Sequence, residues 1–185
     1  LVRPGVPYSI QVDLYDDDGL VTEPVRIAVK VLRFPPVELR PPNDAFANAA
    51  LLSGVSGRVE SDTRHATGEP GEPEDHGGVR SQSVWWKWTA PKGGLLRVNT
   101  LGSTIPSGAP LDTYLAAYRG TSLGSLRDLA ANDDAGSLLT SQVEILVEAG
   151  DVVYLAVAPV VGSPAGTVRL GYELVDGPTV PAWTA

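Results

Sequence analysis

The chain has 185 residues, 43% of them hydrophobic and 19% charged, a composition that fits a globular protein with a sizeable core. Its formal net charge of −8 and its lack of a Lys/Arg cluster disfavour binding to nucleic acid or to an anionic membrane surface. There is no cysteine to form a disulfide or to act as ligand or nucleophile, and no apolar run approaches the roughly 18 residues of a membrane span.

The first 34 residues alternate apolar and polar residues in two stretches, YSIQVDLY and VRIAVKVLRF. The sequence DDDG at 16–19 lies between them and provides turn residues, so we predict a β-hairpin over 1–34. Two isolated strands are marginally stable in water. We therefore expect this hairpin to be completed by a neighbouring domain or by another copy of the chain.

A proline-rich stretch follows the hairpin and predicts a domain boundary. Four prolines between residues 34 and 44 indicate a stiff linker over 35–42. In NDAFANAALL, Asn43 or Asp44 is a candidate N-cap for one short helical turn. The main domain is then expected at 43–175, and the Pro-broken tail 176–185 is read as a further linker.

Residues 51–175 predict an all-β fold, an antiparallel sandwich or jelly roll of about eight short strands joined by Gly-rich turns. The stretch QVEILVEA alternates apolar and polar residues, as TVRLGYEL does later. The stretch DVVYLAVAP is apolar on both faces, which favours a central strand. Further strands are expected in SVWWKWTA, LLRVNT, DTYLAAYRG and SLRDLAAND.

A long loop at 63–82 interrupts these strands and contains both histidines of the chain, His65 and His76. Loops of this length in a compact domain are usually functional or mobile. A zinc site would need three or four converging ligands. Nothing in the spacing of the loop's histidines and acids enforces that convergence, so solvated histidines are the simpler interpretation.

Carboxylates and an amide beside two predicted strands leave two interpretations open. Asn, Asp and Gly are the usual residues of turns. They also offer the oxygen ligands that Ca²⁺ prefers, if the two strand ends are neighbours. The candidate calcium ligands are Asp112, Asn132, Asp133 and Asp134, with Glu69 and Glu72 of the long loop as further ligands. The DDDG turn at 16–19 is similarly ambiguous, with a solvated hairpin favoured over a calcium ion at the domain junction.

Catalytic motifs are missing from the sequence. The stretch SGVSGR lacks the spacing of G-x-S-x-G, and no H-E-x-x-H occurs. A paired-carboxylate glycosidase needs two acids across a cleft, whereas the acids here lie in turn contexts. We therefore predict that the protein is not an enzyme.

Three tryptophans in SVWWKWTA form the last candidate site. Alternation directs Trp86 and Trp88 into the core with Val84. Trp85 points to the other face, so it is the candidate for stacking on a sugar, although a structural role for this strand is favoured.

Six sequence motifs occur in order, and the match that they define covers residues 42–174: PPNDAFANAALLSGVSG, ATGEPGEPEDHGG, SVWWKWTAP, LDTYLAAYRG, LAANDDAG and AGDVVYLAVAP. Together they resemble bacterial extracellular β-sandwich domains related to the pre-peptidase C-terminal domains. The resemblance implies an accessory module of a secreted or surface protein. It also makes calcium relevant, because related collagenase-attached domains bind it. Residues 6–34 resemble the last two strands of a bacterial immunoglobulin-like domain.

From these observations we expect a non-catalytic extracellular or cell-surface module that serves assembly or adhesion. One version is a filament subunit whose N-terminal hairpin adds strands to a neighbouring copy. The alternative is a calcium-stabilised domain that binds carbohydrate or protein beside a secreted hydrolase. Neither version involves nucleic acid or insertion into a membrane.

Overall fold

The computed structural model describes residues 40–73 and 82–177, all within one compact unit that starts at Leu39. The predicted hairpin at 1–34 lies outside the described residues, as do His76 and most of both linkers. The domain boundaries therefore stay predictions. The two helical turns of the described part are η1 (Phe46–Asn48) and η2 (Leu123–Ser125), and neither is long enough to cross a membrane.

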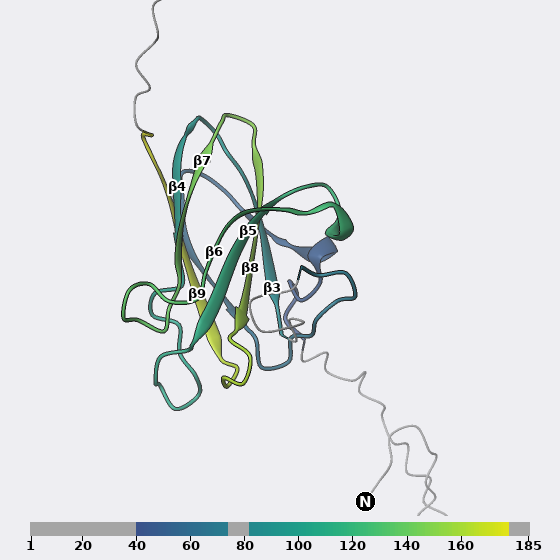
Figure 1. Ribbon diagram of the computed structural model, residues 1–185, viewed down its shortest axis with the longest axis vertical. Helices are drawn as coiled ribbons and strands as arrows, with labels where there is room; N and C mark the ends of the chain where they lie inside the picture. Colours follow the sequence, from purple (N-terminus) through teal and green to yellow (C-terminus); the bar gives the residue numbers. More distant parts are fainter. Residues whose placement is uncertain (1–39, 74–81, 178–185) are drawn as a thin grey trace, which may run out of the picture. The chain divides into compact units, whose positions relative to one another are not determined.

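The described residues form an all-β sandwich of two sheets, which confirms the predicted fold class (Figure 1). The five-stranded sheet has the order β1 (Ala50–Leu52), β3 (Val84–Thr89), β8 (Val152–Pro159), β5 (Thr113–Arg119) and β6 (Arg127–Asn132). The four-stranded sheet has the order β2 (Ser56–Asp62), β9 (Thr167–Val175), β4 (Gly94–Asn99) and β7 (Gln142–Val147). All pairs of strands are antiparallel except β1 with β3.

The main core lies between the two sheets and follows the period of two that a strand imposes. In β7, Val143, Ile145 and Val147 are buried while the residues between them are exposed. In β3, Trp86 and Trp88 are 1% exposed and belong to this core, as alternation predicts. The inward-facing side chains of the four-stranded sheet thus meet the two tryptophans of the opposite sheet.

A second apolar cluster covers the outer face of the five-stranded sheet. It consists of Trp85, Tyr114, Ala116, Tyr118, Tyr154 and Ala156, and both helical turns contribute partly buried residues to it. Figure 1 shows the two turns, blue and green, on the same side of the sandwich. Because β8 and β5 are covered on both faces, nearly all of their residues are buried and most are apolar, without alternation.

Three local expectations differ from the structure. The strand β1 lies within the segment expected to be helical and pairs in parallel with β3, at Ala50↔Trp86. The helical turn η1 does form, but its N-cap is Ala45, without a side-chain hydrogen bond, so neither Asn43 nor Asp44 caps it. The strand β2 was not expected, because its outer edge and outer face are exposed and its sequence lacks apolar alternation.

Candidate functional site: an acidic clamp beside β3

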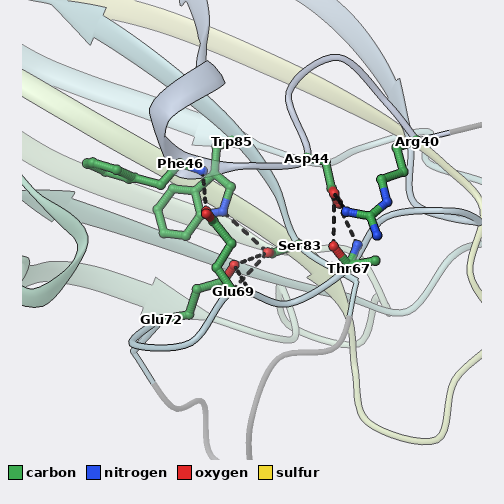
Figure 2. Close-up of polar contacts among 8 residues, drawn as sticks. All are labelled: Arg40, Asp44, Phe46, Thr67, Glu69, Glu72, Ser83 and Trp85. Carbon is green, nitrogen blue, oxygen red and sulfur yellow. Dashed lines mark hydrogen bonds and ion pairs between the residues drawn. The ribbon is translucent and has the colours of Figure 1, made fainter. Parts of the chain in front are cut away.

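Three carboxylates tie the 63–73 loop to the segment before β1 and to Ser83 before β3, and we call Asp44, Glu69 and Glu72 the acidic clamp (Figure 2). Asp44 is 8% exposed and accepts hydrogen bonds from the backbone N–H and the hydroxyl of Thr67, at 2.5 and 2.9 Å. Arg40 lies 3.5 Å from the same carboxylate and partly balances its charge. Asp44 thus fixes the loop rather than the helical turn that follows it.

The other two acids hold the loop against η1 and β3. Glu69 accepts the backbone N–H of Phe46 at 2.6 Å, so it replaces the missing N-cap of η1 from 23 residues away. Glu72 is 8% exposed and accepts the Glu69 N–H at 2.9 Å and the Ser83 hydroxyl at 2.8 Å. The Ser83 oxygen in turn accepts the indole N–H of Trp85 at 3.3 Å. The clamp therefore reaches the outer aromatic cluster.

A buried asparagine extends this network from one sheet to the other. Asn43 is 3% exposed; its backbone oxygen accepts the Trp85 N–H and its side-chain amide donates to the Trp85 oxygen. Its side-chain oxygen accepts the hydroxyl of Ser61 on β2 at 2.7 Å. Asn43 thus bridges Trp85 of β3, in the five-stranded sheet, and Ser61 of β2, in the four-stranded sheet.

A second buried polar network joins the two sheets where β4 ends and where β5 and β7 begin. The hydroxyls of Thr100 and Thr113 lie 2.6 Å apart, and the Thr113 hydroxyl lies 2.8 Å from that of Ser141. The Ser141 hydroxyl donates to the Thr113 carbonyl. One donor order satisfies all three hydroxyls, running from Thr100 to Thr113 to Ser141. Sequence reasoning missed this network, because isolated Ser and Thr residues carry no recognisable motif.

The structure brings together the two strand ends on which the predicted calcium site depends. Strands β5 and β6 are paired, with Leu115 opposite Asn132. The carboxylate of Asp112 accepts the Ser163 hydroxyl at 3.0 Å, and Asn132 accepts the Gln142 N–H and donates to the Asp134 carbonyl. Asp133 and Asp134 are exposed.

The remaining predicted ligands lie elsewhere. Glu69 bonds to Phe46 and Glu72 to Ser83 before β3, whereas Asp112 precedes β5, and β8 separates β3 from β5 by about 10 Å. Among residues 40–73 and 82–177, no three acidic or histidine side chains gather closely enough to hold a metal ion. His65, the described member of the histidine pair, is exposed.

The candidate sugar-stacking residue does not lie on the surface. Alternation correctly directs Trp85 to the face opposite Trp86, but Trp85 is 0% exposed. The ring of Phe46 covers it edge-on, with ring centroids 5.3 Å apart, and Tyr118 lies 5.9 Å away. The expectation of an exposed indole is therefore wrong, because η1 packs over this face.

The described surface includes two grooves that could hold a ligand. One, of about 490 Å³, lies beside the β6–β7 loop and is lined by both polar and apolar side chains, including Asn132, Asp134, Leu101 and Leu138. The other, of about 340 Å³, lies between β1 and β2 with Trp86 at its wall, and its lining is mostly apolar. Neither groove contains the acidic clamp.

The charges near the second groove belong to β2 and its surroundings. Glu60 pairs with Arg169 of β9 at 2.7 Å. Hydrogen bonding to the guanidinium of Arg64 lowers the pKa of the Asp62 carboxyl below its ordinary value. Asp62 is therefore ionised at neutral pH, and the small stabilisation from this exposed pair is lost as the pH falls through the pKa of the folded state.

No known protein family and no curated protein matches the sequence. Several solved structures show a distant likeness. They include the pre-peptidase C-terminal domain of a Bacillus anthracis collagenase, at 11% identity and a TM-score of 0.43, covering 68% of this chain and 94% of that one. A periplasmic inhibitor of g-type lysozyme from Aeromonas hydrophila has 12% identity and a TM-score of 0.44, over 69% and 96% of the two chains.

A surface-associated copper-binding protein of Methylomicrobium album BG8 has 8% identity and a TM-score of 0.42, over 69% of this chain and 98% of that one. Such low TM-scores carry no argument about function. The fold class is therefore assigned from the strand pairing of this chain: a two-sheet β-sandwich whose five-stranded sheet has a covered outer face.

Proposed function

We propose that the described domain is a non-catalytic structural module of a larger secreted or surface protein, related to the pre-peptidase C-terminal domains. The observation that carries this proposal is the use of its buried polar groups. Asn43, Asp44 and Glu72, and the hydroxyls of Thr113 and Ser141, all bind other parts of the domain. Carboxylates, amides and hydroxyls are the side chains that a catalytic site would use. In this domain they hold loops in place and connect the two sheets.

The clamp gives such a module a specific task. Together with Asn43, it fastens the segment that precedes β1: Asp44 and Phe46 are held to the 63–73 loop, and Asn43 is held to β3 of the five-stranded sheet. Fixing this segment to the body of the domain is consistent with a structural role for the module. This suits assembly or adhesion, including the filament contact proposed for the 1–34 hairpin.

The full chain should show no turnover of peptide, ester or glycoside substrates and no saturable binding on a glycan array. The reason is that the outward-facing indole is covered and the buried carboxylates are already hydrogen-bonded. The variants Asp134→Asn and Leu138→Ala, in the groove beside the β6–β7 loop, serve as controls for any signal. Saturable binding that either variant removes would replace the structural proposal with a carbohydrate-binding one.

Calcium stabilisation is the second candidate function, and the pairing of β5 with β6 favours it. Asp112 and the exposed Asp133 and Asp134 lie at the same end of this pair. Because the described acids do not form a convergent trio, such a site would need carbonyl and amide oxygens as further ligands, Asn132 among them.

If this site binds calcium, millimolar Ca²⁺ should raise the melting temperature of the full chain and excess EDTA should reverse the rise, because a ligand of the folded state stabilises it. The variant Asp133→Asn should abolish the effect, whereas Asp128→Asn, on the exposed part of β6, should retain it. Identical melting curves with Ca²⁺ and with EDTA would remove the site.

A further inference from the structure

The free edge of β2 presents a regular set of backbone groups. The Leu174 N–H donates to the Val55 carbonyl and the Thr63 N–H donates to the Gly166 carbonyl, both in the register that pairs β2 with β9. Odd-numbered residues of β2 therefore direct their N–H and C=O groups toward β9. The even-numbered residues direct their backbone groups away from the sheet. Within the described ranges these backbone groups form no hydrogen bond: Ser56, Arg58, Glu60 and Asp62.

The side chains of this edge carry opposite charges on the two sides of Val59, so the edge is complementary to a second copy of itself. Arg58 and Glu60 lie on the outer face of the sheet, on either side of Val59, which packs partly buried against the core. Glu60 already pairs with Arg169. Arg58 is exposed and makes no ion pair within the part of the chain that the structure describes. One cation on this edge thus lacks a carboxylate partner.

We propose that β2 pairs antiparallel with β2 of a second copy of the chain, about a two-fold axis through Val59. In this register Arg58 lies opposite the partner's Glu60, Glu60 opposite the partner's Arg58, and Ser56 opposite the partner's Asp62. All of these residues direct their backbone groups outward, so each opposed pair forms the two hydrogen bonds of an antiparallel ladder. The inference rests on the proposed structural function and names its partner.

Charge selects this register over its neighbours. Shifting the axis to Arg58 or to Glu60 also opposes outward-directed residues, but it places two arginines or two glutamates directly opposite each other, which is unfavourable. A register shifted by one residue, with the axis between two residues, opposes outward-directed with inward-directed backbone groups and forms no ladder. Of these three axes, only the one at Val59 places both Arg58 and Glu60 opposite a residue of the opposite charge.

The apolar groove of about 340 Å³ lies on the same side of the sandwich. Residues 50–52 of β1 and 59–62 of β2 line it, and Leu51 is 79% exposed. A second copy joined along β2 covers this groove and the exposed Leu51 of each copy. The interface is small, so we expect a weak dimer, and the two-fold contact closes at two copies instead of extending into a filament.

Charge reversal and its rescue test the pairing. Sedimentation of the full chain up to about 1 mM should show a dimer. Arg58→Glu and Glu60→Arg should each weaken it by about tenfold, because each places like charges opposite each other twice. The combined variant R58E/E60R should restore the dimer. Glu173→Lys, on the central strand β9 of the same sheet, is the control and should leave it unchanged.

A cross-link tests the position of the axis, since the chain has no cysteine of its own. Val59→Cys should form a disulfide dimer under mild oxidation, because the pair on the axis has Cα atoms about 4.5 Å apart, within disulfide range. Ser56→Cys should not, because the register separates the two copies of this residue by about 20 Å.

A monomer at every concentration, or a dimer that both reversals leave intact, would overturn the pairing; the charges of β2 would then serve only to block edge-to-edge association. Either result leaves the structural proposal untouched, because that proposal fails on turnover or glycan binding instead.

Discussion

Replacing Trp85 with alanine should lower the free energy of unfolding by about 3–5 kcal/mol, the range for removing a fully buried aromatic side chain. The indole is 0% exposed and packs against Phe46 and Tyr118. Its N–H also donates to Ser83, which connects it to the acidic clamp. The loss should therefore include the packing of η1, which has no side-chain N-cap of its own. Urea denaturation followed by circular dichroism measures the change.

Two matched variants separate packing from surface function. Trp85→Phe keeps an aromatic ring but removes the N–H and part of the indole volume, so it should cost less than the alanine variant, about 1–2 kcal/mol. Leu51→Ala removes a side chain that is 79% exposed and should stay within about 0.5 kcal/mol of the parent. A W85A protein as stable as the parent would mean that the indole is not held between η1 and the sheet.

The strands that bury one or both faces could be predicted from the sequence, because burial leaves a pattern in it. The alternation of β7 and the continuous apolar run of β8 both match the observed burial, and β8 is a central strand between β3 and β5. The inward direction of Trp86 and Trp88 follows from the same period. These features depend on nearest neighbours along the chain, which a single sequence contains.

The features that could not be predicted depend on contacts between distant residues. Nothing near Trp85 indicates that Phe46, 39 positions earlier, covers its ring, or that Glu69 serves as the cap of η1. The strand β2 carries Gly, Ser and charges because one edge and one face meet solvent, so it lacks the apolar period that marks other strands. Glu69 and Glu72 are calcium candidates in the sequence because it shows their charge. It does not show that their carboxylates accept hydrogen bonds from backbone N–H groups.

Glu72 tests whether the clamp is structural or part of a metal site. Replacing Glu72 with alanine should lower the free energy of unfolding by about 2–3 kcal/mol, because the buried Ser83 hydroxyl and the Glu69 N–H both lose this acceptor. Glu72→Gln keeps an amide oxygen at the same position and should cost less. Glu144→Gln, which disrupts an exposed ion pair with Arg97, should change stability by less than about 1 kcal/mol.

Denaturation of each variant in excess EDTA and in millimolar Ca²⁺ distinguishes the two roles. A structural Glu72 predicts the same loss in both conditions, since its partners are protein donors. A calcium ligand predicts a loss confined to the calcium-loaded protein, because removing a ligand weakens only the state that holds the ion. A loss seen only with Ca²⁺ would therefore mean that Glu72 is a metal ligand. The 63–73 loop would then be held by the ion and not by the acidic clamp.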